Sequence, residues 1–179
     1  MAPGLCRKAS TSYFDNRFER QVVKLMPGDY YIGKQHELLV TVLGSCVSLC
    51  LFDPVLKISG MNHYMLPGCP KDDEPILTRY GWPAMTCLLR EMLSAGAVKS
   101  RLVAKIFGGA QGFHQEVSTL RVGEKNIACA RQFLEEHHMA CRAENVGGHD
   151  ARRLNFSSDT GQVNLLRMPH THRRSALIK

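Results

Sequence analysis

Two residues whose types and spacing suit nucleophilic chemistry are Cys46 and His63, which lie seventeen positions apart. Cys46 falls within the longest apolar run of the sequence, residues 39–52, and directly follows Gly44 and Ser45, which interrupt that run. The thiolate is the reactive form of cysteine, and a nearby imidazole can accept the thiol proton and later protonate a leaving group. The pair therefore predicts covalent catalysis with Cys46 as the nucleophile and His63 as its base.

The Gly44-Ser45 step predicts a sharp turn in front of the thiol. Glycine gives the backbone freedom to turn, and backbone N–H groups at such a turn can point at negative charge that develops on a substrate oxygen. We therefore expect Gly44 and Ser45 to form a turn that carries an oxyanion-binding site beside Cys46.

Simpler interpretations of the same residues remain open. A cysteine in an apolar run is more often a small buried residue than a nucleophile, and a histidine between Asn62 and Tyr64 is more often hydrogen-bonded within a core. The turn before Cys46 favours the catalytic interpretation without deciding the matter. A structural zinc site needs two closely spaced ligand pairs, which the cysteines and histidines here do not form, so no metal site is predicted.

Two glycine-rich stretches, residues 108–110 and 147–150, predict turns that line a cleft near the thiol. Neither has the GxxxxGK[ST] or GxGxxG form of a phosphate-binding loop, so no nucleotide cofactor is predicted. The residues that we expect at the cleft or at a partner-binding rim are Gly108, Gly109, Gly148 and Arg152.

The composition is typical of a globular protein of one domain, with 179 residues of which 44% are hydrophobic and 22% are charged. No apolar segment is long enough to cross a bilayer, so no membrane insertion is expected, and the first residues lack the apolar segment of a secretory signal. The seven cysteines include no CxxC pair, which favours reduced thiols and a cytoplasmic location.

The net charge of +7 indicates an acidic partner. Apart from Arg152-Arg153 and residues 170–174, the basic residues are dispersed, so the pattern argues against a nucleic-acid partner. The same charge suits an acidic protein surface, because it speeds and orients encounter.

The elements that must position these residues are predicted from hydrophobic spacing. Apolar residues recur at helical spacing over residues 80–95 and 123–138, whereas short apolar or alternating runs predict strands. Because the helices do not alternate regularly with the strands, the pattern predicts an α+β fold, a mostly antiparallel sheet core with two helices packed outside. The predicted strands cover residues 22–26, 30–32, 39–52, 58–67, 102–107, 141–146, 152–156 and 163–168.

We expect a single catalytic domain over residues 21–168. Residues 1–20 are polar and predict a mobile N-terminal extension, in which an aromatic cluster at residues 13–18 docks on the core. Residues 169–179 predict a basic, flexible tail.

One set of stretches recurs in a known family. The set comprises residues 40–54 (VTVLGSCVSLCLFDP), 60–67 (GMNHYMLP), 105–110 (KIFGGA), 126–128 (NIA) and 147–153 (GGHDARR), with 13–15 (YFD) and 25–30 (LMPGDY) near the start. It resembles the chemoreceptor glutamine deamidase family CheD over nearly all of residues 13–168. The pairing of LGSCV with MNHYMLP is highly specific.

The resemblance implies a β-sandwich with helices outside, a fold shared with bacterial toxin deamidases. It implies a protein-glutamine deamidase, a hydrolase that converts glutamine to glutamate in the methylation region of chemotaxis receptors, with glutamyl methyl esters as a side substrate. It also implies Cys46 as nucleophile, His63 as base and no metal or other cofactor. The implied partners are the cytoplasmic helices of receptors and a CheC-type phosphatase.

The third catalytic residue of the family is a threonine, commonly six residues before the cysteine, and Val40 occupies that position here. The threonine of this chain is Thr41, five residues before Cys46. In an undistorted strand this shift would turn the hydroxyl to the other face, whereas a local irregularity near Gly44 would restore it. We assign the role to Thr41 on this basis.

Two other classes of function remain open. One is a non-catalytic adaptor that binds receptors or a CheC-type phosphatase; Cys46 and His63 argue against it, and Val40 argues for it. The other is a nucleic-acid-binding module, whose affinity would fall steeply with salt.

Overall fold

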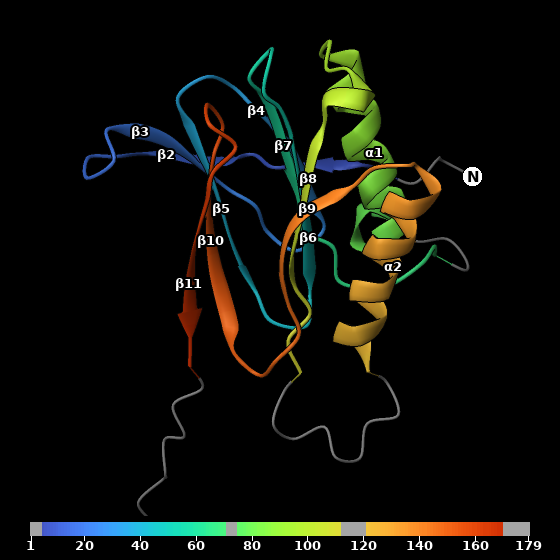
Figure 1. Ribbon diagram of the computed structural model, residues 1–179. Helices are drawn as coiled ribbons and strands as arrows, with labels where there is room; N and C mark the ends of the chain where they lie inside the picture. Colours follow the sequence, from blue (N-terminus) through green and yellow to red (C-terminus); the bar gives the residue numbers. More distant parts are fainter. Residues whose placement is uncertain (1–4, 71–74, 112–120, 170–179) are drawn as a thin grey trace, which may run out of the picture.

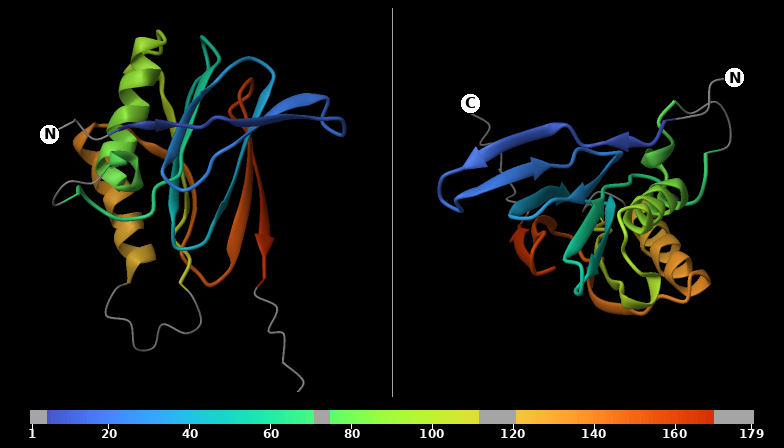
Figure 2. Two further views of the ribbon diagram at one scale, coloured as in Figure 1. Left: turned by 180° about the vertical axis from the view of Figure 1, so that it is seen from behind. Right: turned by 90° about the horizontal axis from the view of Figure 1, so that it is seen from above.

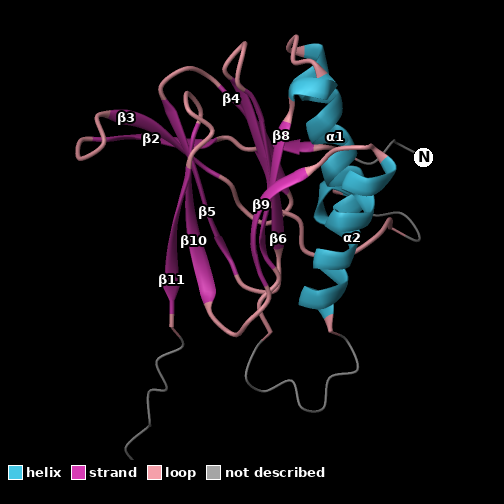
Figure 3. Cartoon of the chain, viewed as in Figure 1, coloured by secondary structure: helices cyan, strands magenta, loops and turns pink. Residues whose placement is uncertain are grey.

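The computed structural model of the protein describes residues 5–70, 75–111 and 121–169, which form three layers (Figure 1). Helices α1 (Gly81–Ser94) and α2 (Val122–Glu136) cover one face of a six-stranded sheet, and a five-stranded sheet covers the other face. Figure 3 marks helices and strands in the same view. The remaining elements are β1 (Arg7–Lys8), β2 (Thr11–Asp15), β3 (Arg20–Lys24), β4 (Asp29–Gly33), β5 (Glu37–Leu43), β6 (Val47–Asp53), β7 (Ile58–Asn62), η1 (Leu77–Arg79), η2 (Lys99–Arg101), β8 (Val103–Gly108), β9 (Cys141–Val146), β10 (Ala151–Ser157) and β11 (Val163–Met168).

The strand order is β1-β4-β7-β6-β8-β9 in one sheet and β11-β10-β5-β3-β2 in the other. Of the nine strand pairs among the described residues, six are antiparallel, and β1–β4, β3–β5 and β8–β9 are parallel. The two further views show both helices on the side of the six-stranded sheet that faces away from the other sheet (Figure 2). The predicted α+β fold, with a mostly antiparallel, sandwich-like core and two helices outside, is confirmed.

Two apolar clusters hold the layers together, and β6 contributes to both of them. Val47, Leu49 and Leu51 face the helices, whereas Cys50 and Phe52 face the five-stranded sheet. All seven residues of β6 are buried. A strand that is covered on both faces has no polar face, which explains why this part of the sequence is a continuous apolar run.

The long apolar run of the sequence divides between the two sheets. Its first half forms β5 in the five-stranded sheet, and its second half forms β6 in the six-stranded sheet. Residues 44–46 lie between the two strands and carry the chain across. The sharp turn predicted from Gly44 and Ser45 is therefore confirmed, and it changes sheets as well as direction.

The N-terminal segment differs from the predicted extension. Residues 7–8 form β1, which pairs with β4 at the edge of one sheet, and residues 11–15 form β2, which pairs with β3 at the edge of the other. Edge strands expose most of their side chains, so β1 and β2 lack the apolar alternation that marks a strand in sequence. Residue 169 of the predicted tail is described, whereas residues 170–179 lie outside the described residues.

The cysteines also differ in part from expectation. The structure joins Cys6, next to β1, to Cys87 of α1 in a disulfide across a sequence separation of 81 residues. Such a separation gives no signal in sequence, because only the fold brings β1 beside α1. Cys46, Cys50, Cys69, Cys129 and Cys141 are free. Among the described helices, none has the length and apolar character needed to cross a membrane.

Candidate active site

Cys46 is half-buried at the end of the turn that joins β5 to β6. The residues that follow β8 hydrogen-bond to the backbone of this turn. The N–H of Gly109 donates to the carbonyl of Cys46 at 2.8 Å, and the N–H of Ala110 donates to the carbonyl of Gly44 at 2.8 Å. Both partners thus act on the backbone of the turn and leave the thiol uncovered by these contacts.

Gly108 is required at the end of β8 for two reasons. Its φ angle of +111° favours glycine, and a Cβ at this position would lie 2.2 Å from the carbonyl oxygen of Cys46. The expectation that Gly108 and Gly109 lie beside the thiol-bearing turn agrees with this packing, although they contact its backbone and not the thiol.

His63 directly follows β7 and is only 3% exposed. Its backbone is hydrogen-bonded to the end of the loop between β3 and β4 and to the first residue of β4. The N–H of His63 donates to the carbonyl of Asp29 at 2.8 Å, and the N–H of Gly28 donates to the carbonyl of His63 at 2.7 Å. The position of the ring therefore depends on that loop.

Thr41 of β5 lies against the ring of His63. Its Oγ1 is 2.8 Å from Nδ1 of His63 and 2.9 Å from the carbonyl oxygen of Leu25. The hydroxyl has one proton, which it donates to Leu25, so Oγ1 accepts the hydrogen bond from His63 Nδ1–H. This fixes the neutral ring with its proton on Nδ1 and leaves Nε2 as an acceptor.

Val40, at the position where the family carries its threonine, faces the other way. It packs with Val22 and Leu38 in a small cluster on the outer side of the five-stranded sheet. Because Cys46 lies in the turn and outside β5, counting residues back from the cysteine does not determine which residue faces His63. The one-residue shift therefore does not remove the hydroxyl from the site.

Cys46 and His63 lie on the same side of the six-stranded sheet. Val47 and Tyr64 are a directly opposed pair that exchange two backbone hydrogen bonds, each of 3.1 Å. Cys46 and His63, each one residue before a member of that pair, are therefore diagonal neighbours, a relationship that separates residues by about 7–8 Å. Nε2 of His63 is buried and has no hydrogen-bond partner in the part of the chain that the structure describes.

Burial shifts the pKa values of both groups toward their neutral forms. Desolvation lowers the pKa of His63 to about 4, against smaller opposing effects of the Leu25 carbonyl and the Asp29 carboxylate. Desolvation also raises the pKa of the Cys46 thiol, against a smaller effect of its own backbone N–H. The resting pair is therefore a thiol and a neutral imidazole, not a thiolate and an imidazolium.

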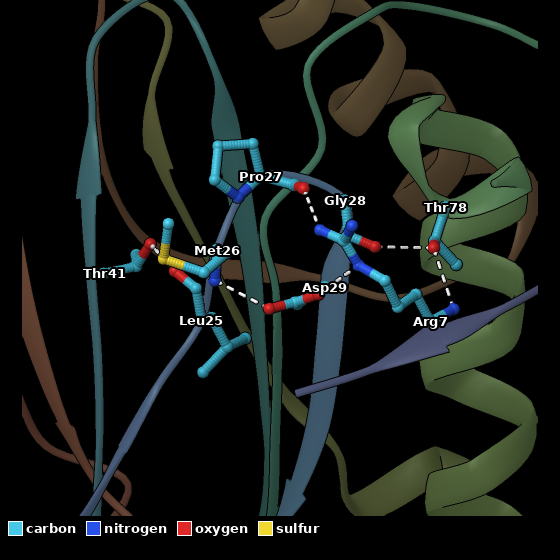
Figure 4. A network of polar contacts seen from close by, with 8 residues as sticks. All are labelled: Arg7, Leu25, Met26, Pro27, Gly28, Asp29, Thr41 and Thr78. Atoms are coloured by element: carbon cyan, nitrogen blue, oxygen red, sulfur yellow. Dashed lines mark hydrogen bonds and ion pairs between the residues drawn. The ribbon is translucent and has the colours of Figure 1, made fainter. Parts of the chain in front are cut away.

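The loop that holds His63 is in turn fastened by Arg7 of β1 (Figure 4). Arg7 Nε donates to Asp29 at 2.5 Å, and its guanidinium also donates to the carbonyl of Pro27. The other oxygen of the Asp29 carboxylate accepts from the N–H of Met26 at 2.8 Å. Thr78 completes the network, because its hydroxyl donates to the carbonyl of Gly28 at 2.6 Å and accepts from the N–H of Arg7.

A cavity of about 420 Å³ opens beside His63 and Thr41. Its charged lining residues are Lys24 and Arg153, both basic. Cys46 is not among the lining residues. The full set is Tyr13, Lys24, Leu25, Met26, Pro27, Val40, Thr41, Val42, His63 and Arg153.

Arg152, predicted at a rim, lies in the interior with 3% of its surface exposed. Its guanidinium donates to the carbonyls of Gly108 at 2.8 Å and Asn145 at 2.7 Å, and to that of Gly147. The structure thus makes Arg152 a link between the end of β8 and the loop before β10, where it is not accessible to a partner. Gly148 is exposed, and its carbonyl accepts from the N–H of Gln111 at 2.7 Å.

Sequence reasoning gave no site role to Asn126 or Asp29, which hold the backbone around Cys46 and His63. Asn126 lies on the buried side of α2 among Ile127, Ala130 and Phe133. A polar residue on the apolar stripe of a helix is the signal that would have indicated it. Among the described residues, no three histidine, cysteine or acidic side chains gather as a metal site would require.

Residues 65–167 match the sequence model of the family described as "CheD chemotactic sensory transduction". The chain is 44% identical over 161 residues to "Probable chemoreceptor glutamine deamidase CheD" of Stenotrophomonas maltophilia (strain K279a), covering 89% of this chain and 80% of that protein. It is 38% identical over 181 residues to the protein of the same name from Bordetella parapertussis, covering 99% and 85%.

Among solved structures, the chain is distantly similar to the Bacillus licheniformis hypothetical protein YfiH, with a TM-score of 0.41 and 12% identity over 76% of this chain and 61% of that chain. The match to the family model covers residues 65–167, and the identity to the two curated relatives extends over 89% and 99% of this chain. The chain belongs to the CheD family.

Proposed function

We propose that this protein deamidates glutamine side chains of chemoreceptors, converting them to glutamate with release of ammonia. The relatives carry the name of this activity, and the site offers the groups it needs. The observation that carries the proposal is the acceptor nitrogen of His63. Nε2 is buried, has no partner among the described residues, and belongs to a ring on the same side of the sheet as Cys46.

The first half of the reaction forms a thioester. The sulfur of Cys46 attacks the carboxamide carbon while the thiol proton passes to Nε2 of His63, and the carbonyl electrons move to the oxygen. His63 then gives that proton to the amide nitrogen, the C–N bond breaks, and ammonia leaves. Because the resting pair is neutral, the thiolate forms only as the substrate is attacked.

Backbone N–H groups of Ser45 and Cys46 are the donors that we assign to the tetrahedral oxyanion. Within the part of the chain that the structure describes, neither N–H donates to the backbone of another residue. Free N–H groups aimed at the place where charge develops stabilise it without reorganisation. Gly44 contributes by allowing the turn.

The second half of the reaction hydrolyses the thioester. His63 takes a proton from water, the hydroxide attacks the carbonyl carbon, and the C–S bond breaks as the proton returns to the sulfur. Glutamate leaves, and thiol and neutral imidazole are restored. Thr41 keeps the His63 ring in the tautomer that both halves of the reaction use. A glutamyl methyl ester would follow the same route with methanol as the leaving group.

The finer parts of the proposal concern the partner and the place. We assign the cytoplasmic helices of receptors as substrate, a cytoplasmic location, and a CheC-type phosphatase as a binding partner. The net charge of +7 and the two basic residues at the cavity beside His63 support an acidic protein partner. Because β1 and β2 pair with the sheets, the catalytic domain that we propose extends from residue 5 to residue 168.

The test is incubation of a purified receptor cytoplasmic fragment with the protein, followed by peptide mass spectrometry. Conversion of –NH2 to –OH at a glutamine is expected with wild type and with Cys50→Ala, a matched control four residues further along the chain. It is not expected with Cys46→Ala or His63→Ala. No conversion by wild type would favour the adaptor, and equal conversion by Cys46→Ala would overturn the proposed role of Cys46.

A further inference from the structure

Asn126 of α2 joins the two segments that carry the proposed catalytic pair. Its side-chain amide Nδ2 donates to the carbonyl of Ser45 at 3.0 Å and to the carbonyl of Met65 at 2.9 Å. Ser45 directly precedes Cys46, and Met65 follows His63 by two residues. Asn126 is fully buried, so both hydrogen bonds form away from water.

A second contact joins Asn126 to the segment that follows β7 and contains His63. The hydroxyl of Tyr64, the residue after His63, donates to the backbone carbonyl of Asn126 at 2.6 Å. Tyr64 is itself fully buried. Asn126 therefore makes one hydrogen bond to the turn before Cys46 and two to the segment that contains His63. These three bonds fix the distance between the turn and that segment.

The contact with Ser45 also has an orientation. In a trans peptide the carbonyl of Ser45 and the N–H of Cys46 point in opposite directions. A donor that holds the Ser45 carbonyl toward α2 therefore aims the Cys46 N–H away from α2. That N–H has no backbone acceptor on any other described residue, and it lies close enough to its own thiol to lower the pKa of that thiol against burial.

We propose that Asn126 is a positioning residue for the deamidation reaction: it locks the peptide plane between Ser45 and Cys46 and the spacing of Cys46 from His63. The proposal rests on the function proposed above. Asn126 does not touch substrate; it acts through the Cys46 N–H, the donor assigned to the oxyanion. A buried amide with two carbonyl acceptors suits this task, because a hydroxyl could donate to only one of them.

The experiment compares Asn126→Ala and Asn126→Ser with Ser158→Ala. Ser158 is an equally buried residue whose hydroxyl accepts from the N–H of Glu37 at 2.9 Å, at the opposite end of β5 from the site. Ser158→Ala thus removes a buried hydrogen bond without touching the proposed machinery. Folding of each variant is followed by circular dichroism, and all assays are run where the variants are folded.

Loss of one preorganised oxyanion donor costs about 100-fold or more in kcat, so a fall of that size with little change in KM is expected for both Asn126 variants. Ser158→Ala is expected to lose stability but keep kcat. The second readout needs no deamidation: alkylation of Cys46 by iodoacetamide, followed against pH by mass spectrometry. An upward shift of the apparent pKa of Cys46 is expected in the Asn126 variants and not in Ser158→Ala.

The outcomes separate the two proposals. If wild type does not deamidate receptor but the alkylation shift is seen, the proposed function fails, while the effect of Asn126 on the peptide in front of the Cys46 thiol stands. If wild type is active and both Asn126 variants keep kcat and the Cys46 titration of wild type, the positioning role is wrong. Failure of both variants to fold where Ser158→Ala folds would also overturn it, in favour of a purely structural role.

Discussion

Thr41 and His63 belong to different sheets, yet the hydroxyl of one lies 2.8 Å from Nδ1 of the other. The proton of that hydroxyl is already donated to the carbonyl of Leu25, so the contact has only one direction, from Nδ1–H to Oγ1. The tautomer of His63 follows from this chain of two hydrogen bonds.

The first prediction concerns that contact. Thr41→Val removes the acceptor of Nδ1–H while keeping the shape, so kcat is expected to fall about 100-fold, the size typical of losing well-placed general base catalysis. Thr41→Ser should restore most of the rate. Steady-state deamidation of a receptor fragment provides the measurement.

A matched control lies one residue earlier. The double variant Val40→Thr with Thr41→Val places a hydroxyl at the position usual for the family, on the face of β5 that points away from His63. No rescue is expected. Recovery of the rate would show that the hydroxyl does not act through the contact seen here.

The second prediction concerns the protonation state of Cys46. Burial raises the pKa of this thiol and lowers that of His63, so the resting enzyme should hold a thiol at neutral pH. Alkylation of Cys46 by iodoacetamide should therefore be slow at pH 7 and rise only under alkaline conditions. Rapid alkylation at pH 6, insensitive to pH above that, would instead indicate a thiolate–imidazolium pair.

The third prediction links His63 to stability. The unfolded chain takes up a proton on this ring near pH 6.5, whereas the folded chain does so only near pH 4. Between these values the unfolded state binds more protons, so the free energy of unfolding falls as the pH falls, by about 2 kcal/mol from this ring between pH 7 and pH 5. Urea unfolding at both pH values measures it.

The control for that linkage is His63→Gln, which removes the titrating ring. Its free energy of unfolding should change less between pH 7 and pH 5 than that of wild type, by about the same 2 kcal/mol. Equal pH dependence in both proteins would assign the effect to other groups.

The fourth prediction concerns Asp29, whose carboxylate favours the protonated form of His63. Asp29→Asn should lower the pKa of His63 further, so the acid limb of the kcat/KM profile should move to lower pH. The substitution also loses the charge-assisted bond to Arg7, which is worth about 2 kcal/mol in stability. The pH profile separates the electrostatic effect from the loss of stability.

Asp159→Asn is the matched control for that profile. Asp159 also pairs with an arginine, Arg20, at 3.2 Å, but it lies by His36 and away from His63. Its replacement should leave the acid limb where it is in wild type. A shift of equal size in both variants would point to net charge and not to Asp29 itself.

Much of the fold could be predicted from the sequence, because the buried strands are strongly apolar and the helices have regular stripes. β6 is buried on both faces and reads as a continuous apolar run, while the Gly44-Ser45 interruption marks a real turn. β1 and β2 could not be found in the same way. Their pairing depends on the edges that the rest of the fold offers, not on their own hydrophobicity.

The sequence was enough to propose Cys46 and His63 as the reacting pair, but not to find the residues that hold them in place. Which face Thr41 presents could not be counted from Cys46, because the turn at residues 44–46 ends β5 before the cysteine. Arg152 was expected at a partner-binding rim, and only the four backbone carbonyls that accept from its guanidinium explain its place in the interior. The hydrogen bond to Gly108 joins residues 44 positions apart and leaves no local pattern in the sequence.

The chain crosses from one sheet to the other between Leu43 and Val47, and this crossing bears on the rate of the reaction. Thr41 belongs to the five-stranded sheet, whereas Cys46 and His63 adjoin strands of the six-stranded sheet. A slip of the layers by a fraction of a side chain would uncouple the imidazole from its hydroxyl without unfolding either sheet. We therefore expect turnover to depend on how tightly the two sheets pack against each other.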